Sequence, residues 1–179
     1  METTMAKTLY AATMSLDGFI AGPGGDMSWL TEHLGAPNPT AAGLMDRIGC
    51  LLVGGRTFRG DDPNKGTDAE GAFGGQYQGP AVVLTGRPPA EPVARTVFTD
   101  DLAQAVAQAR ELAGDRYVNV LGAEVARNCL TAGLLDEILM FVAPVLLGDG
   151  VRVFDHPGGT RVRLEPLPDT TELWYRVVR

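Results

Sequence analysis

The sequence predicts an α/β fold built on a mixed, mainly parallel central sheet with an antiparallel C-terminal edge. In the middle of the chain, short apolar runs typical of buried strands alternate with amphipathic helices, which indicates parallel strands with helices on both faces of the sheet. Residues 138–178 instead carry several strands in succession, which favours antiparallel strands at one edge. The 179 residues suffice for one core, and no linker or repeat divides them, so we expect a single domain over residues 1–179.

The N-terminal segment is expected to supply one strand, a long loop and a capped helix. Leu9–Met14 is short and apolar, as is typical of a buried strand, and the glycine-containing turns of residues 15–28 then indicate a loop. A helix is expected from Pro39 to Ile48. Asn38 suits its cap, proline suits its first position and Gly49 suits its exit.

Strands and helices alternate through the middle of the chain. Asp101–Ala113 shows the clearest helical period, because its apolar residues fall on one face and Gly114 follows it. The polar, glycine-rich segment Asp61–Gly79 is expected to be a loop. The expected strands of this region are Cys50–Val53, Ala81–Thr85 and Tyr117–Leu121, and its other expected helices begin at Arg56-Thr57 and span Ala123–Ala132.

The C-terminal part of the chain is expected to form strands. Pro144 and the turn Gly148–Gly150 follow the first of them, and Pro168-Asp169 suits the turn of a hairpin between the last two. The expected strands are Ile138–Ala143, Val151–Phe154, Val162–Leu167 and Leu173–Val178.

The charge and hydropathy of the chain argue against two kinds of partner. The net charge is −7, and the two lysines belong to no basic run, so we expect no nucleic-acid partner. The longest uncharged apolar stretch, Ile138–Leu147, is too short to span a bilayer. The polar start Met1–Lys7 has no apolar signal core. We therefore expect a cytoplasmic protein without a membrane partner.

The sequence also lacks the motifs of several enzyme classes. It has no Walker motif and no Gly-x-Ser-x-Gly, which argues against a nucleoside triphosphatase and a serine hydrolase. His33 and His156 are not at metal-ligand spacing from cysteines or acids, so no metal is expected. Cys50 and Cys129 lie in apolar surroundings and are expected to be buried thiols.

Three turns that follow buried strands carry residues suited to binding the phosphates of a dinucleotide. In an open α/β sheet, ligands bind beyond the carboxyl ends of the strands. Small residues allow the backbone to approach an anion, and hydroxyl and guanidinium groups complete a phosphate site. Glu124 in the third turn is either a ligand contact or an acid favoured at a helix start. The three turns are Gly54-Gly55-Arg56-Thr57, Thr85-Gly86-Arg87 and Gly122-Ala123-Glu124.

Several segments resemble a known reductase family. Met14–Ala21 resembles the first loop of the reductase (C-terminal) domain of the bifunctional riboflavin biosynthesis protein and of its dihydrofolate-reductase-like relatives. Gly54–Phe58 is similar to that domain's first phosphate turn, and Gly133–Ile138 with Ala143–Gly148 resembles its later helix, strand and turn. The resemblance implies a dihydrofolate-reductase-like three-layer sandwich, NADPH as the cofactor and hydride transfer.

The resemblance also implies a role for individual residues. The loop Gly18–Ser28 would be a lid that excludes water. Asp17 is either a turn former or a proton-relay group, and Trp29 either anchors the lid by packing or stacks on the substrate. The implied cofactor contacts are Ala12, Ile20 and Leu121 at the nicotinamide; Gly54, Gly55, Arg56 and Thr57 at the pyrophosphate; Thr85 and Arg87 at the 2′-phosphate; and Gly122, Ala123 and Glu124 at a further phosphate turn.

The sequence departs from the family pattern at identifiable positions. The arginine that usually follows the first glycine of the first turn is replaced by Gly55, and Arg59 stands where an acid often follows the aromatic residue. Leu34 stands where dihydrofolate reductases have a carboxylate. Phe19 and Leu121 stand where the riboflavin-pathway enzyme has a lysine and a glutamate. Both standard sets of substrate-handling groups are therefore missing.

These observations predict an NADPH-dependent reductase of a small, flat heteroaromatic substrate, pterin-like or pyrimidine-like. The alternative is a non-catalytic nucleotide-binding or flavin- or pterin-binding dimeric protein of the same fold, which the missing acid favours. We also expect a homodimer formed through the late strands, because their apolar residues exceed what one core face needs. The family resemblance implies the same self-pairing.

Overall fold

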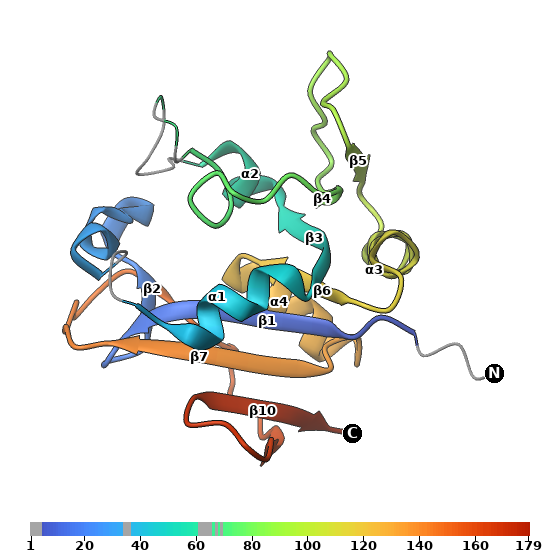
Figure 1. Ribbon diagram of the computed structural model, residues 1–179. Helices are drawn as coiled ribbons and strands as arrows, with labels where there is room; N and C mark the ends of the chain where they lie inside the picture. The colour runs from blue at the N-terminus through green and yellow to red at the C-terminus, as the bar shows by residue number, and fades with distance from the viewer. Residues whose placement is uncertain (1–4, 34–36, 61–65, 67, 69) are drawn as a thin grey trace.

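The computed structural model describes residues 5–33, 37–60, 66, 68 and 70–179, which form a central sheet flanked by helices (Figure 1). The elements in chain order are β1 (Thr8–Ser15), β2 (Phe19–Ala21), the 3₁₀ helices η1 (Pro23–Gly25) and η2 (Ser28–His33), α1 (Pro39–Asp46), β3 (Ile48–Gly54), α2 (Gly55–Arg59), β4 (Ala81–Leu84), β5 (Thr96–Thr99), α3 (Leu102–Ala113), β6 (Tyr117–Leu121), α4 (Ala123–Thr131), β7 (Glu137–Ala143), β8 (Val151–Arg152), β9 (Arg163–Pro166) and β10 (Leu173–Val178).

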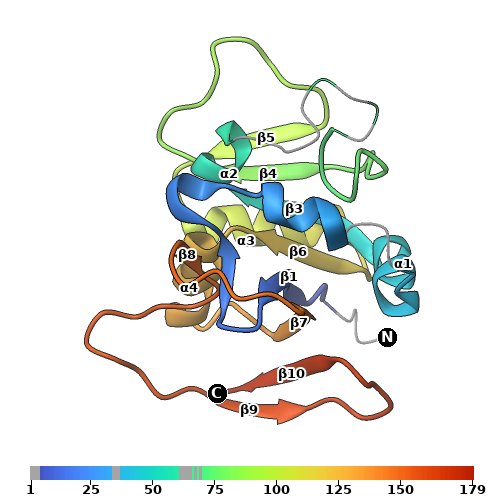
Figure 2. The ribbon, with the colours of Figure 1, turned by 90° about the vertical axis from the view of Figure 1, so that its left-hand side faces the viewer.

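The main sheet has eight strands in the order β5-β4-β3-β6-β1-β7-β10-β9, which Figure 2 shows from top to bottom. The six strands from β5 to β7 are parallel. β10 is antiparallel to β7, and β9 is antiparallel to β10. The predicted mixed sheet with an antiparallel C-terminal edge is therefore confirmed, and so is the late hairpin.

Helices cover both faces of the sheet, which gives three layers (Figure 2). On one face, α3 and α4 bury a cluster that includes Val106, Val118 and Cys129. On the other face, α1 lies over a second cluster, in which Leu44 packs with Leu9. Cys50 and Cys129 are free and buried, as predicted.

The helices follow their capping signals. The Asp101 carboxylate accepts a hydrogen bond from the Gln104 amide at 2.7 Å, and Gly114 ends α3 with a φ of +67°. Asn38 caps α1 as predicted, but α1 ends at Asp46. Its expected last residue, Ile48, is instead the first residue of β3 and is 1% exposed.

Four elements were not predicted, and one predicted strand is misplaced. One of the four is η2, which follows the expected loop. The expected loop over residues 15–28 contains β2 and η1, and β5 forms a short edge strand in a segment where none was expected. Strand Val151–Phe154 is only two residues long and pairs with β2 in a separate two-stranded sheet, so its expected place in the edge is wrong. These elements are too short to show a period in the sequence.

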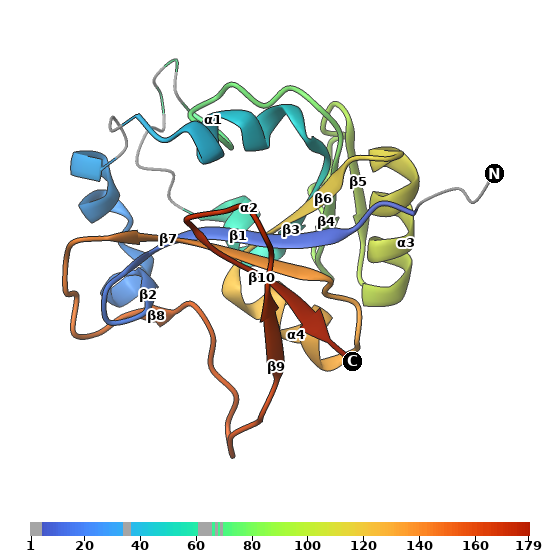
Figure 3. The same cartoon turned by 60° about the horizontal axis from the view of Figure 1, so that its bottom comes forward.

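Segments between strands complete the fold. The chain between β8 and β9 projects away from the sheet (Figure 3). The expected loop Asp61–Gly79 has no helix or strand in its described part, residues 66, 68 and 70–79, and the rest lies outside the described residues. No helix in the described chain is both long and apolar enough to cross a membrane.

Candidate functional site

The three glycine-containing turns lie side by side at the carboxyl end of the sheet. β4, β3 and β6 are neighbouring parallel strands, so their carboxyl ends meet at one edge. A Cβ added at Gly55 would lie 2.8 Å from Thr85 Oγ1, and one at Gly122 would lie 2.6 Å from Thr57 Oγ1. Both separations are too short for a real side chain. The first turn therefore contacts both of the others through its glycine and its threonine.

The third turn leaves backbone donors open at the start of α4. Gly122 is the N-cap of this nine-residue helix, with a φ of +108° that favours glycine, and no side chain caps the helix. Behind it, Gly54 is buried, and a Cβ there would lie 2.8 Å from Val125 Cγ2. Glycine at these positions keeps the turns close-packed and leaves the first amides of α4 without a side-chain acceptor.

Arg56 and Glu124 form an ion pair across the first and third turns. The distance from Arg56 Nη1 to Glu124 Oε2 is 3.4 Å, and the two side chains are 90% and 54% exposed. A pair this exposed contributes at most about 1 kcal/mol to stability. Glu124 is thus a helix-start acid that also offsets the charge of Arg56 beside the turns.

Arg59 joins the second turn, although the sequence reasoning had noted it only as a departure from the family pattern. Its Nη1 donates to Thr85 Oγ1 at 3.1 Å and to the Arg87 carbonyl at 3.5 Å. The Arg87 amide donates to the same hydroxyl oxygen at 3.1 Å. The sequence signal that could have found this residue is its spacing, because residues 56 and 59 lie one helical turn apart.

The side chains predicted to wall the nicotinamide do not share one face of the sheet. Ala12 packs against the cluster under α3 and α4, whereas Leu121 packs against the cluster on the α1 face. Ile20 is half-buried at the centre of β2. Alternation along β1 places Thr13 on the same face as Leu121. Thr13, and not Ala12, therefore shares the face of Leu121 at this end of β1.

The Asp17 carboxylate joins two loops through hydrogen bonds. Its carboxylate accepts hydrogen bonds from the Ser15 hydroxyl at 2.6 Å, the Leu147 amide at 3.1 Å and the Gly148 amide at 2.7 Å. These donors, the Ser15 hydroxyl first among them, lower its pKa from 3.8 to about 2. At neutral pH the group is therefore ionised and holds the turn after β7 against the loop after β1.

Comparison with known proteins then assigns the family. Residues 6–167 match the RibD C-terminal domain. The chain belongs to this family. The uncharacterized protein YwjB of Bacillus subtilis (strain 168) is 26% identical over 162 residues, which cover 89% of each chain. The resemblance inferred from the sequence motifs is thereby confirmed.

Solved structures confirm the dihydrofolate-reductase-like fold. A riboflavin biosynthesis protein from Shewanella sp. PV-4 is 24% identical with a TM-score of 0.66, over 97% of this chain and 99% of that one. The riboflavin biosynthesis reductase Rib7 of Saccharomyces cerevisiae is 18% identical with a TM-score of 0.57, over 99% and 92%. Dihydrofolate reductase from Enterococcus faecalis, complexed with NADP(H), is 13% identical with a TM-score of 0.53, over 96% and 92%.

At two positions where the riboflavin-pathway enzyme has a lysine and a glutamate, this RibD-family chain has apolar residues. Phe19 is 5% exposed, and the Arg152 guanidinium lies 4.7 Å from the centre of its ring. The cation at this place therefore comes from β8 and not from position 19. Leu121 is half-buried at the end of β6. Leu34 lies outside the described residues.

Trp29 lies on η2, in the segment that follows the predicted lid. It is half-buried, and its ring centre is 6.2 Å from that of His33. Its indole Nε1 is buried and has no hydrogen-bond partner among the residues that the structure describes. In the described part of the chain, no three His, Cys, Asp or Glu side chains gather into a metal site.

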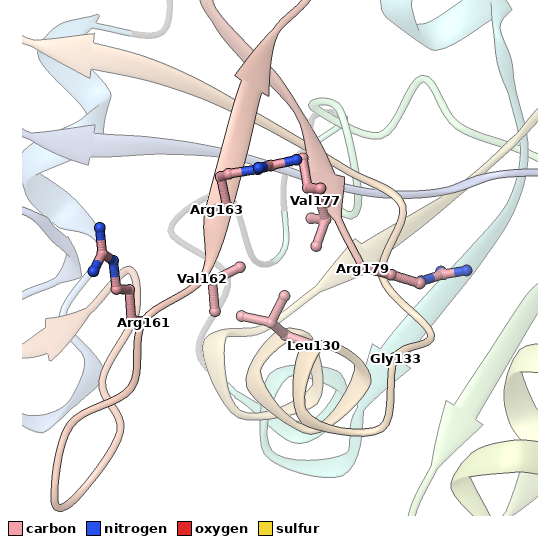
Figure 4. Close-up of a pocket in the computed structure, with 8 residues that line it drawn as sticks. Leu130, Gly133, Arg161, Val162, Arg163, Val177 and Arg179 are labelled. Carbon is pink, nitrogen blue, oxygen red and sulfur yellow. The ribbon is translucent and has the colours of Figure 1, made fainter.

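A separate cavity of about 480 Å³ lies away from the three turns, between α4 and the β9–β10 hairpin (Figure 4). Leu130 of α4 faces Val162 and Val177 of the hairpin region across it. Arg163 and Arg179 lie at its border. Their charges are paired, because Arg163 is 3.6 Å from Glu165 and Arg179 is 2.7 Å from Asp136.

Proposed function

We propose that this protein is an NADPH-dependent reductase of a small heteroaromatic substrate, pyrimidine-like or pterin-like. The observation that carries the proposal is the contact of three glycine-containing turns at the ends of adjacent strands. Gly55 and Gly122 let the turns approach one another more closely than a side chain would allow, and the start of α4 has no side-chain cap on its amides. Arginines surround the turns, which suits a ligand with several phosphates. The family and the NADP(H) complex of a fold relative support the same cofactor.

The chain's own residues would bind, orient and enclose the reactants. When bound, NADPH supplies the hydride, so the protein's task is to hold the acceptor against it in a dry site. The amides of Gly122 and Ala123 and the Thr57 hydroxyl would hold the phosphates of the bound cofactor. Asp17 holds the turn after β7 beside the lid, while its low pKa leaves it no proton to give at neutral pH. Water then supplies the proton that accompanies the hydride.

Fluorescence titration with NADPH tests the cofactor part of the proposal. Binding should enhance the nicotinamide emission and saturate at one molecule per chain. Reduction is then tested by following the loss of nicotinamide absorbance with pyrimidine and pterin acceptors. Dihydrofolate is expected to turn over far below about 10 per second, the usual scale for enzymes. A lack of NADPH binding at millimolar concentration would refute the reductase.

A second candidate is a non-catalytic nucleotide-binding or flavin- or pterin-binding protein. The buried Phe19 and the half-buried Leu121 favour it, because neither side chain can handle a proton or bind a charged group. Such a protein would bind NADPH, flavin or pterin without oxidising the nicotinamide in the presence of any acceptor. Stoichiometric binding with no turnover across the panel would select this function over the reductase.

We further propose that the protein works in the cytoplasm as a homodimer formed through its late strands. Apolar side chains of β7, β8, β9 and β10 and of the segment just after β8 stay about two-fifths exposed, although Met140 and Trp174 are buried. A second copy would cover this surface with a self-complementary patch. Light scattering at micromolar concentration should report twice the 19.0 kDa chain mass, and Phe154→Asp should reduce it to one chain. The exposed residues are Val142, Val151, Phe154, Leu164 and Leu173.

A further inference from the structure

The hydroxyl of Thr85 is the meeting point of two donors at the second turn. Its oxygen accepts from Arg59 Nη1 and from the Arg87 amide, both at 3.1 Å. A hydroxyl oxygen has two acceptor sites, so both are used, and the hydroxyl proton is left to donate. An incoming anion would therefore meet the Thr85 hydroxyl and the Arg59 guanidinium at one place, in the turn that also carries Arg87.

The charges at this place are not compensated within the described chain. Arg56 is paired with Glu124, whereas no carboxylate of the described residues lies within ion-pair distance of Arg59 or Arg87. Both of these side chains are exposed. A guanidinium beside a hydroxyl donor, with a second arginine in the same turn and no carboxylate partner for either among the described residues, suits a phosphate monoester, which carries close to two negative charges at neutral pH.

Gly55 explains how Arg59 reaches the second turn. A Cβ added at Gly55 would lie 3.1 Å from Arg59 Nη2 and 2.8 Å from Thr85 Oγ1. The absence of a side chain at position 55 therefore leaves the space through which the Arg59 guanidinium contacts Thr85. The first turn carries no arginine at position 55, and the cation is supplied from the last residue of α2 instead.

From this geometry we propose that Arg59 is the residue that selects NADPH over NADH, a proposal that rests on the proposed function. NADPH differs from NADH only by a phosphate monoester on the adenosine ribose. Arg59 binds this phosphate together with Thr85 and Arg87, and contributes more to the selection than Arg56. Arg56 instead acts on the phosphates that both dinucleotides share, with its charge partly offset by Glu124.

The test measures dissociation constants for NADPH and NADH by nicotinamide fluorescence in the wild type and in single variants. Arg59→Gln should weaken NADPH about 10- to 100-fold, the usual loss for a hydrogen bond between charged groups, and leave NADH almost unchanged. Arg59→Lys, which keeps the charge, should lose less. Arg56→Gln removes the same charge from the same helix, and it should weaken both dinucleotides alike. Arg116→Gln, an exposed change before β6, should alter neither affinity.

A second measurement is independent of the nicotinamide and of turnover. The thermal shift caused by adenosine 2′,5′-bisphosphate should exceed that caused by adenosine 5′-monophosphate, and Arg59→Gln should remove most of the difference. If NADPH binds but Arg59→Gln keeps the wild-type preference, or if the wild type has no preference, the assignment of Arg59 is wrong while cofactor binding stands. If neither dinucleotide binds, the proposed function itself fails.

Discussion

The two ends of the parallel strands use charged side chains in opposite ways. At the amino end, Glu137 is 1% exposed and accepts hydrogen bonds from Lys7 Nζ at 2.9 Å, the Tyr117 hydroxyl at 2.9 Å and Trp174 Nε1 at 3.0 Å. At the carboxyl end, the Arg59 guanidinium is exposed, and the partners that it has among the described residues are neutral oxygens. A charge whose partners are already in place stabilises the fold, whereas a charge without a counterion is available for a ligand.

Asp136 is a second carboxylate at the amino end whose hydrogen-bond and ion-pair partners are in place. Burial alone would raise the pKa of Asp136, but hydrogen bonds from Thr8 and the charges of Arg110 and Arg179 outweigh it, so the pKa is lowered. Burial, followed by the nearby Glu137 carboxylate, raises the pKa of Tyr117 to about 12. Both effects keep these groups in one protonation state at neutral pH. This end of the sheet is therefore expected to be rigid and unresponsive to ligands.

The largest expected effect comes from removing the buried Glu137 carboxylate at the amino end of the strands. Glu137→Ala would leave the donors of Tyr117 and Trp174 buried without an acceptor, and should cost about 3 kcal/mol of the free energy of unfolding. Urea denaturation measures this loss. The cofactor affinity of the folded variant should not change, because Glu137 lies at the other end of the strands from the three turns.

A matched control for this variant is Glu165→Ala on β9. Glu165 is also a glutamate with an arginine partner, but it is exposed, and its distance to Arg163 is 3.6 Å. Removing it should change the free energy of unfolding by less than about 0.5 kcal/mol. Equal losses for the two variants would contradict the distinction between the two ends.

The fold was predictable where the sequence carries a long signal. Asp101–Ala113 has both a cap and a period, and it is a helix within one residue of the prediction. β2 and β5 were missed because three or four residues show no period, and because their pairing depends on partners remote in the sequence, such as Arg152 for Phe19. Such elements are set by tertiary contacts that local patterns do not encode.

The candidate site was predictable as a set of turns but not as a set of contacts. Glycines after buried strands indicated which three turns would meet, and they do meet. The pairing of Arg56 with Glu124, and the reach of Arg59 to Thr85, depend on side-chain directions across separate turns. The opposite faces of Ala12 and Leu121 depend on the register between β1 and β6.

An intermediate effect is expected from filling the space between the turns at the carboxyl end. Gly122 and Gly114 both have a positive φ, so alanine at either position should cost about 1 kcal/mol of stability. Only at Gly122 would the added Cβ collide with Thr57 Oγ1, at 2.6 Å, whereas a Cβ at Gly114 meets nothing within 4 Å. Fluorescence titration should therefore show that Gly122→Ala weakens NADPH about tenfold or more, equivalent to about 1.4 kcal/mol. Gly114→Ala should leave the affinity unchanged, and an equal loss in both variants would remove the turns from the site.

The smallest expected effect concerns Asp17. Its carboxylate has its hydrogen-bond partners in place, as Glu137 has, but it is partly exposed. Its folded-state pKa of about 2 is below its ordinary value of 3.8. A lowered pKa stabilises the folded state fully above the unfolded pKa, and the contribution is lost as the pH falls through the folded pKa. The stability difference between wild type and Asp17→Asn should therefore be constant above about pH 5, shrink as the pH falls through about 2 and disappear by about pH 1.

Thermal unfolding of the two proteins at a series of pH values measures this difference. Asp115→Asn is the control, because Asp115 is exposed and accepts no side-chain hydrogen bond in the described chain, so its difference from wild type should stay near zero throughout.

The three hydrogen bonds to Asp17 join the loop after β1 to residues 147 and 148. Loss of these bonds should therefore loosen the substrate side before it unfolds the sheet. Asp17→Asn should accordingly expose the lid segment, residues 18–28, to faster amide exchange at neutral pH, while amides of β6 keep their protection. Unchanged amide exchange in residues 18–28 would show that Asp17 only forms a turn and does not restrain the lid segment.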